Sequence, residues 1–253
     1  MIRKSQMALP STSTFTKLAG ALLAATVLAA PAQAGVVRFD TGYSMPVVHG
    51  DVWVESGYKL VFDAYNDNAD SNTAVGSIID GSDPWPCVEM ACPISGDGSY
   101  YGAFNDSVVW LSAEREGGEF QLKSIDASFI GAYADLGSYP AISGLLRMQA
   151  IRADNSYELI DLPLFGPGAN GFQFDTYSLL EPYASMSFVE IAMFGMVCNA
   201  SLSCSAFNSN QGQFAIDNIV LVAVPEPASA AIFGLGMMGL VAGARRRKAS
   251  VNV

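Results

Sequence analysis

The sequence predicts an all-β fold, an antiparallel β-sandwich, for residues 35–223, and three observations carry this prediction. Short runs rich in Val, Ile, Phe, Tyr and Trp alternate apolar and polar residues, as half-buried strands do. Clusters of Gly, Asn, Asp and Pro separate these runs. No amphipathic helix longer than about ten residues interrupts them. Many short strands with turn punctuation are typical of antiparallel sandwiches and barrels.

The expected strands follow one another along the whole central region. Each is a run of β-branched or aromatic residues bounded by turn-forming residues. In chain order they cover residues 36–39, 51–55, 58–62, 107–111, 120–125, 145–151, 157–160, 172–177, 187–194 and 214–221.

Charge is unevenly distributed along the 253 residues. Between Gly35 and Val224 the chain has 23 acidic and six basic residues, a net charge of −17, whereas seven of its 13 basic residues lie in the terminal segments. A nucleic acid partner needs a basic footprint, so this composition argues against one. The single histidine, His49, excludes most His-based metal and triad chemistry.

The N-terminal segment, residues 1–34, has the order of a secretory signal peptide. Basic residues (Arg3, Lys4, Lys17) precede an apolar run at 18–30, and Ala32-Gln33-Ala34 follows. A run this short is below the length of an ordinary membrane span. We expect signal peptidase to cut between Ala34 and Gly35, so that the mature domain begins in an oxidising compartment. The alternative is a buried core helix.

The C-terminal segment, residues 224–253, has three parts. Pro225-Glu226-Pro227 comes first, an apolar stretch at 228–244 follows, and the basic cluster Arg245-Arg246-Arg247-Lys248 comes last. The apolar stretch is at the short limit for a transmembrane helix, and the positive-inside rule keeps the basic cluster cytoplasmic. The alternative is a plain single-pass anchor.

This tripartite tail resembles the PEP-CTERM sorting signal of Gram-negative bacteria. The resemblance implies that an exosortase-type membrane transpeptidase recognises Pro225, Glu226 and Pro227 and removes the segment ending in the arginine cluster. The protein would be anchored transiently in the inner membrane and then attached at the cell surface or released. Proteins of this class tend to occur in bacteria that make exopolysaccharide.

The segment from Gln213 to Leu221 resembles the closing strand of jelly-roll, carbohydrate-binding-like domains, and residues 120–127 and 172–189 fit the same pattern. A Gln-Phe-x-x-Asp element (Gln213, Phe214, Asp217) before the tail also resembles a subclass of PEP-CTERM proteins, to which no activity attaches. These likenesses imply a jelly-roll-like sandwich. They also imply a structural Ca²⁺ between Asp40, after the first strand, and Asp217 in the last. The alternative is that Asp217 bonds to a neighbouring backbone.

The four cysteines form two local pairs, Cys87 with Cys92 and Cys198 with Cys204. Four thiolates could hold zinc, but structural zinc sites favour tighter spacing, and an exported chain favours disulfides. We expect two local disulfides that brace loops. A second calcium candidate is the oxygen-rich run with Asp63, Asp67, Asn68 and Asp70, for which a turn-forming loop is the alternative.

The aromatic residues permit a sugar-binding surface. Trp85, Tyr100 and Tyr101 are the candidate ligand-binding residues, whereas Trp53 and Trp110 lie in expected strands and fit the core. Catalytic motifs are missing: no G-x-S-x-G, no phosphate-binding glycine loop and no cysteine-protease signature is present. We therefore expect a non-enzymatic surface or matrix protein that binds exopolysaccharide. The alternatives are a glycan-active enzyme with a carboxylate pair and a purely structural matrix component.

Overall fold

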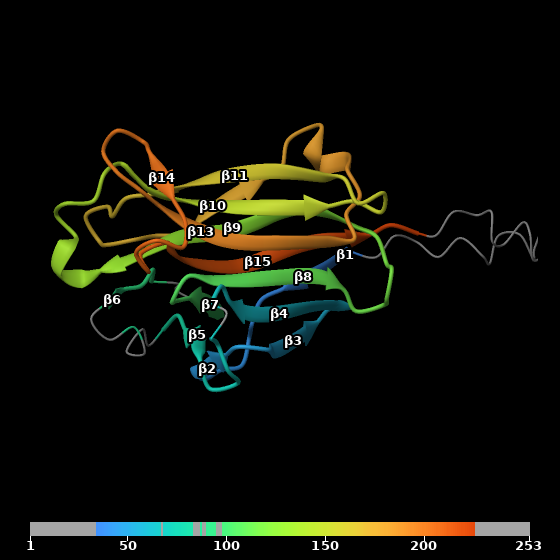
Figure 1. The fold of residues 1–253 in the computed structure, drawn as a ribbon, viewed down its shortest axis with the longest axis horizontal. Coiled ribbons are helices and arrows are strands. Elements are labelled where there is room, and N and C mark those ends of the chain that lie inside the picture. Colours follow the sequence, from blue (N-terminus) through green and yellow to red (C-terminus); the bar gives the residue numbers. More distant parts are fainter. Residues whose placement is uncertain (1–33, 67, 83–86, 88–89, 95–97, 226–253) are drawn as a thin grey trace, which may run out of the picture. The chain divides into compact units, whose positions relative to one another are not determined.

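The computed structural model describes residues 34–225, apart from residues 67, 83–86, 88–89 and 95–97 (Figure 1). The signal segment before Ala34 and the tail from Glu226 onward, including the three arginines, lie outside the described residues. The chain from Gln33 to Val224 forms one compact unit. Within the described part, no helix has the length and apolar character needed to cross a membrane.

Fifteen strands and two short 3₁₀ helices make up the described unit (Figure 1). The 3₁₀ helices cover Tyr133–Asp135 and Tyr183–Ser185. The strands are β1 (Ala34–Val37), β2 (Met45–Val48), β3 (Asp51–Glu55), β4 (Tyr58–Ala64), β5 (Ala74–Asp80), β6 (Met90–Ala91), β7 (Ser99–Ala103), β8 (Ser107–Ala113), β9 (Phe120–Ala132), β10 (Ile142–Ile151), β11 (Tyr157–Phe165), β12 (Asp175–Ser178), β13 (Glu190–Cys198), β14 (Cys204–Ser205) and β15 (Gln213–Ala223).

The strands form two antiparallel sheets, which confirms the predicted sandwich. One sheet has the order β12-β9-β15-β7-β5-β2, with β1 paired to β15 and β6 to β9. The other has the order β11-β10-β13-β8-β4-β3, with β14 paired to β13. Each expected strand overlaps an observed one. Strands β2, β5, β6, β7 and β14 were not expected, and the run at 172–177 begins as a strand only at Asp175.

Strand β15 lies in the middle of its sheet. Along one edge it pairs with β9, from Gln213 opposite Ile130 to Ala223 opposite Phe120. Along the other edge, β7 pairs with its first part and β1 with its last part. The register with β9 shifts between Asp217 and Val220, where Asn218 has φ +44°. This bulge therefore lies where the second edge of β15 passes from β7 to β1.

The core lies between the sheets. The inward side chains of β15 (Phe214, Ile216, Ile219 and Leu221) are fully buried in it. A second, smaller apolar cluster contains Ile79, Tyr100, Ile130 and Ala215, which point the other way from their strands, and it includes Cys87. The loop that carries the Cys87–Cys92 disulfide therefore covers part of the outer face of this sheet.

Truncating Phe214 tests the central position of β15. Its ring is fully buried, and its backbone lies opposite Phe129 of β9 and Ala103 of β7. We expect Phe214→Ala to lower the free energy of unfolding of residues 35–224 by about 3–5 kcal/mol, measured by urea denaturation. The control is Val54→Ala on β3, whose side chain is exposed and whose truncation should change stability by less than ~0.5 kcal/mol. Equal urea midpoints for the two variants would contradict the assignment.

Candidate functional site

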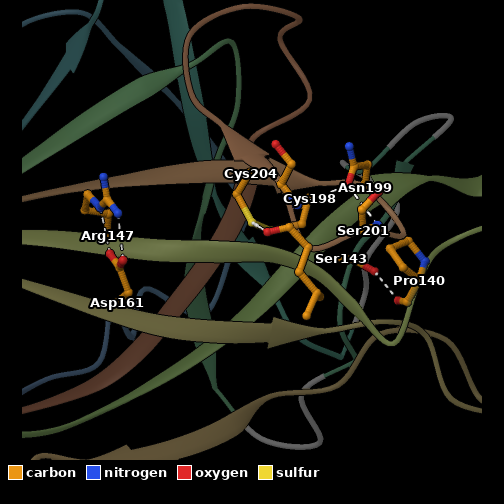
Figure 2. Close-up of a disulfide and its surroundings, with 10 residues drawn as sticks. Pro140, Ser143, Arg147, Asp161, Cys198, Asn199, Ser201 and Cys204 are labelled. Atoms are coloured by element: carbon orange, nitrogen blue, oxygen red, sulfur yellow. Dashed lines mark hydrogen bonds and ion pairs between the residues drawn. A yellow bond between two sulfur atoms is a disulfide. The ribbon is translucent and has the colours of Figure 1, made fainter.

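Both predicted disulfides are confirmed. Cys87 is bonded to Cys92 and Cys198 to Cys204, and the described residues contain no free cysteine. Cys198 and Cys204 are also register partners in the β13–β14 pair, so this bridge closes a tight hairpin. Inside it, the Asn199 side chain accepts the amides of Ser201 and Ser203. Figure 2 shows this disulfide and, on β10 and β11, the Arg147–Asp161 ion pair at 2.7 Å.

The prediction that Tyr100 and Tyr101 bind a ligand is wrong. Both side chains are fully buried, so neither ring has a face available to a sugar. The Tyr100 hydroxyl donates to the Pro93 carbonyl at 2.8 Å, and the Tyr101 hydroxyl donates to the Val75 carbonyl at 3.0 Å. Burial raises the pKa of both phenols far above their usual value. Trp85, the third candidate, lies outside the described residues.

Asp217 is a buried carboxylate on the outer side of β15. Its oxygens accept the backbone amide of Asn218 at 2.7 Å and the Asn218 side-chain amide at 3.2 Å. Burial raises the pKa of Asp217 to about 7; the Asn218 backbone amide opposes this shift, and the charges of Asp126, Asp40 and Glu55 add to it.

Asp40, the other predicted calcium ligand, is exposed and accepts the amide of Ser99 at 3.3 Å. The charge of Asp40 adds to the upward shift of the Asp217 pKa. Among the described residues, however, no group of three or more His, Cys, Asp or Glu side chains has a metal-binding arrangement. Calcium at Asp40 and Asp217 stays a prediction.

The described part of the oxygen-rich loop forms local turns. One Asp70 oxygen accepts the Asn72 amide and the Thr73 hydroxyl, and the Asn66 side chain accepts the Asn68 amide. The bonds to Asp70 lower the pKa of its carboxyl, with the Asn72 backbone amide contributing most and the Thr73 hydroxyl next. They are the Asx-type bonds that make Asp and Asn common in turns. The described residues fit the turn-forming alternative.

A cavity that the sequence did not indicate lies at the end of this loop. Its volume is about 790 Å³, and we call it the amide cleft. Three connections meet there: the segment after β4, the β7–β8 turn and the β14–β15 loop. The residues that line it are Ala64, Tyr65, Asn66, Asn68, Asn105, Asp106, Phe207 and Asn210.

A ladder of three aromatic rings leads from β13 to the opening of the amide cleft. Tyr65 stacks on Phe207, with ring centroids 3.8 Å apart and planes inclined by 16°. Phe207 in turn packs against Phe194 of β13, with centroids 5.0 Å apart. The outermost ring, Tyr65, is 64% exposed. Tyr65 is therefore a supported aromatic surface that is open to solvent.

Side-chain bonds hold the cleft's loops together. The Asn210 amide donates to the Asp106 carboxylate at 3.1 Å, and the Asn210 side chain donates to the Asn105 side chain at 2.9 Å. Asn105 also donates to the Ala74 carbonyl at 2.9 Å. The turn at 105–106 is thus fixed to the β14–β15 loop, whose start is held by the Cys198–Cys204 disulfide.

Left-handed backbone conformations are concentrated around the amide cleft. Asn105, Asp106, Phe207 and Asn210 have φ values of 55°, 53°, 60° and 52°. Asn and Asp tolerate this region, but a bulky residue such as Phe207 rarely adopts it. Strain of this kind is retained where the surrounding structure imposes it, often at ligand-binding sites. Here it places the Phe207 ring beneath Tyr65.

The chemistry of the amide cleft suits hydrogen bonding to hydroxyl groups. Its polar lining consists of four asparagine side chains and the Asp106 carboxylate, together with the Tyr65 hydroxyl. Amides both donate and accept, and a carboxylate accepts. Among the described lining residues there is no Lys, Arg or His that could pair with an anion. The cleft therefore favours an uncharged polyhydroxyl ligand over an acidic one.

Tyr65, Phe207 and Asn210 could not be predicted from the sequence as one site, because they come from loops far apart in the chain. Two local signals were available: an aromatic residue next to asparagines at 65–66, and another between a cysteine pair and an Asn-rich run at 207–210. Each signal alone is compatible with an ordinary turn. Only the tertiary fold joins them.

The raised pKa of Asp217 makes stability depend on pH. Between about pH 4 and pH 7 the folded chain holds a proton on Asp217 that the unfolded chain has lost, so this residue lowers stability as the pH rises through that window. In Asp217→Asn this contribution is absent. We expect the free energy of unfolding of the variant, relative to wild type, to increase by about 3 kcal/mol from pH 4.5 to pH 8 in EDTA.

The control for this pH series is Asp154→Asn, which removes an exposed carboxylate of the β10–β11 turn. The free energy of unfolding of this variant should depend on pH between 4.5 and 8 in nearly the same way as that of wild type. If the free energies of unfolding of wild type and Asp217→Asn change in parallel with pH, Asp217 ionises normally in the folded chain.

Comparison with known proteins identifies the tail. The model of the PEP-CTERM protein-sorting motif matches residues 223–248, which confirms the predicted sorting motif. The motif implies an exported protein that is anchored transiently in the membrane and processed by an exosortase-type enzyme. No curated protein matches the chain.

Several solved structures are similar to this chain. A family 29 carbohydrate binding module is 10% identical over 77% of this chain and 90% of its own, with a TM-score of 0.35. A DUF4465 family protein from Bacteroides ovatus is 10% identical over 76% and 100%, with a TM-score of 0.43. The CBM22-1 xylan-binding domain from Paenibacillus barcinonensis is 8% identical over 76% and 94%, with a TM-score of 0.27. The assignment of the two-sheet sandwich is based on the strand pairings of this chain alone.

Proposed function

We propose that this protein is a non-enzymatic, exported surface or matrix protein that binds an uncharged segment of exopolysaccharide in the amide cleft. The observation that carries the proposal is the exposed Tyr65 ring, stacked on Phe207 beside four asparagines and one carboxylate. Sugar rings have apolar faces and polar edges, so they are bound by an aromatic surface next to amide and carboxylate groups.

Rigidity supports this assignment. The Cys198–Cys204 disulfide, the Asn210 bonds to the 105–106 turn and the packing of Phe207 on Phe194 fix the cleft before any ligand arrives. A preformed site avoids the cost of ordering loops on binding. Loops held by a rigid scaffold are also the usual place for binding residues.

The proposed export and processing determine where the domain acts. In the proposal, signal peptidase removes residues 1–34, the segment 228–244 halts export in the inner membrane, and an exosortase removes the tail. The mature domain is then attached at the cell surface or released into the matrix. Its strong negative charge favours spacing between copies and disfavours binding to acidic polymers.

A structural Ca²⁺ at Asp40 and Asp217 is part of the proposal. The charge of a cation would offset the repulsion that the carboxylates of Asp126, Asp40 and Glu55 exert on Asp217. If it binds, millimolar calcium should raise the unfolding midpoint of wild type but not that of Asp217→Asn. Equal shifts in the two chains would exclude these ligands.

One observation favours a second candidate, a glycan-active enzyme. Asp126 and Asp217 lie directly opposite each other on β9 and β15, and the Asn218 amide bonds to both carboxylates. Cross-strand partners at this spacing are close enough to act as an acid–base pair. If they do, Asp217→Asn abolishes polysaccharide hydrolysis, whereas in the binding proposal there is no hydrolysis to lose.

Removing the Tyr65 ring tests the binding proposal. We expect Tyr65→Ala to weaken co-sedimentation of residues 35–224 with the producing strain's own exopolysaccharide at least ~10-fold, because the stacking surface is lost. The matched control is Tyr157→Ala, which removes an exposed tyrosine from β11, the edge strand at the far side of the same sheet from β4. If both variants bind like wild type, the amide cleft is not the site. If wild type itself does not bind, the structural component and the glycan-active enzyme remain as candidates.

Replacing Pro225, Glu226 and Pro227 together with alanine tests the routing. We expect the variant to keep Arg245–Lys248 at steady state in a strain with an active exosortase, whereas wild type loses them. Intact-mass spectrometry of membrane and medium fractions distinguishes the two forms. The control replaces Ser250 and Asn252, which lie beyond the basic cluster, with alanine. Loss of the tail from the triple variant would show that another feature directs processing.

A further inference from the structure

A second cavity lies at the end of the sandwich where β1 begins and β15 ends, and we call it the seam cavity. Its volume is about 510 Å³, which is within the range of small-molecule sites. Strands β1 and β15 of one sheet line it together with the start of β4 and the end of β8 from the other sheet. The β3–β4 turn and the β8–β9 connection complete its wall. Both sheets therefore contribute to this site.

The seam cavity gathers positive charge in a domain that has little of it. Between Gly35 and Val224 there are six basic residues and 23 acidic ones. Two of the six, Arg38 and Arg115, line this cavity, and Glu119 is the one acidic residue among the described lining residues. Two guanidinium groups and one carboxylate leave the cavity with one positive charge, although the domain around it is strongly negative.

Local contacts hold both arginines at the cavity. The Arg38 backbone amide donates to the Glu55 carboxylate at 3.2 Å, which fixes the chain just after β1. A Cβ atom built on Gly118, another lining residue, would lie 3.8 Å from Nε of Arg115, so the guanidinium group of Arg115 begins at the cavity wall. A guanidinium group has five N–H donors in a planar fork, so it can bind a ligand in addition to a protein partner.

A buried hydroxyl group without a partner lies in the same wall. The Tyr58 side chain is 3% exposed, and no group among the described residues bonds to its hydroxyl. A Cβ atom built on Gly35, which also lines the cavity, would lie 2.8 Å from Cε2 of this ring, next to the carbon that bears the hydroxyl. Burial raises the pKa of Tyr58, so the phenol stays protonated and can donate. Because buried polar groups in native proteins are nearly always paired, this hydroxyl indicates a bound acceptor.

One carboxylate group satisfies all of these features. It accepts N–H groups from Arg38 and Arg115 and the hydroxyl of Tyr58, and its charge brings the cavity to neutrality. The apolar side chains of Val36 and Val224 also line the cavity and offer contact to the uncharged part of a ligand. The negative charge of the domain repels a polyanion, so the ligand that fits is small and has a single carboxylate.

We propose that the seam cavity binds an organic monocarboxylate of about monosaccharide size, with Arg38 and Arg115 on its carboxylate and Tyr58 as a further donor. The site is separate from the amide cleft and does not depend on the proposed function, since no residue lines both cavities. The two sites have opposite preferences: an uncharged sugar in the amide cleft and an acid in the seam cavity.

Equilibrium dialysis of the full-length chain against radiolabelled glucuronate, in non-ionic detergent at low salt, tests the site. We expect Arg38→Gln to bind glucuronate at least ~10-fold more weakly than wild type, and Tyr58→Phe, which keeps the ring, at least ~3-fold more weakly. The matched control is Arg152→Gln, which removes the same charge from the β10–β11 turn, outside the cavity lining. Urea midpoints show that each variant is folded.

Two further measurements separate this site from the amide cleft. Tyr65→Ala should bind glucuronate like wild type, and any binding of labelled glucose, which lacks the carboxylate, should be unchanged in Arg38→Gln. The inference is overturned if wild type does not bind glucuronate, if Arg38→Gln binds it like wild type, or if Arg152→Gln loses as much affinity as Arg38→Gln. Loss of glucuronate binding in Tyr65→Ala would assign the acid to the amide cleft and also overturn it. Loss of polysaccharide binding alone in that variant leaves it intact.

Discussion

The sandwich depends on the position of β15. This strand contributes four fully buried side chains to the core, pairs with β9 along one edge, and divides its other edge between β7 and β1. Because it is the last strand of the domain, the central contacts of the sheet join residues far apart in sequence. Such non-local pairing is slow to form. The bulge at Asp217–Asn218 is the local adjustment that lets two strands share one edge.

Much of the fold was predictable because strand periodicity and turn residues are local signals. The two disulfides followed from cysteine spacing in an exported chain. Strands β5 and β7 were missed because Gly76, Ser77 and Gly102 interrupt the β-branched pattern. Tyr100 and Tyr101 were misplaced for a related reason. On a sheet with one open face, one of two adjacent residues points to solvent, but here Tyr101 enters the main core and Tyr100 enters the second cluster on the outer face.

The candidate site was harder to predict than the fold. The amide cleft joins residues 64–68, 105–106 and 207–210, and its features arise from how these loops meet. The stacking of Tyr65 on Phe207 depends on a left-handed Phe207, which no sequence pattern indicates. Asp217 is the opposite case. Its place in the last strand was evident, but its burial comes from neighbouring strands and loops, and so does the resulting shift of its pKa.

The pairing of Gly35 with Leu221 has a consequence for the architecture of the domain. Its first and last strands are neighbours in one ladder, so a short peptide could join the two ends of the domain without crossing the sandwich. New ends could then be opened in an exposed connection such as the β10–β11 turn, at residues 152–156. Chains with adjacent termini tolerate this rearrangement well. The two ends of the domain thus lie in adjacent strands, one following the predicted signal segment in the sequence and the other leading into the sorting motif.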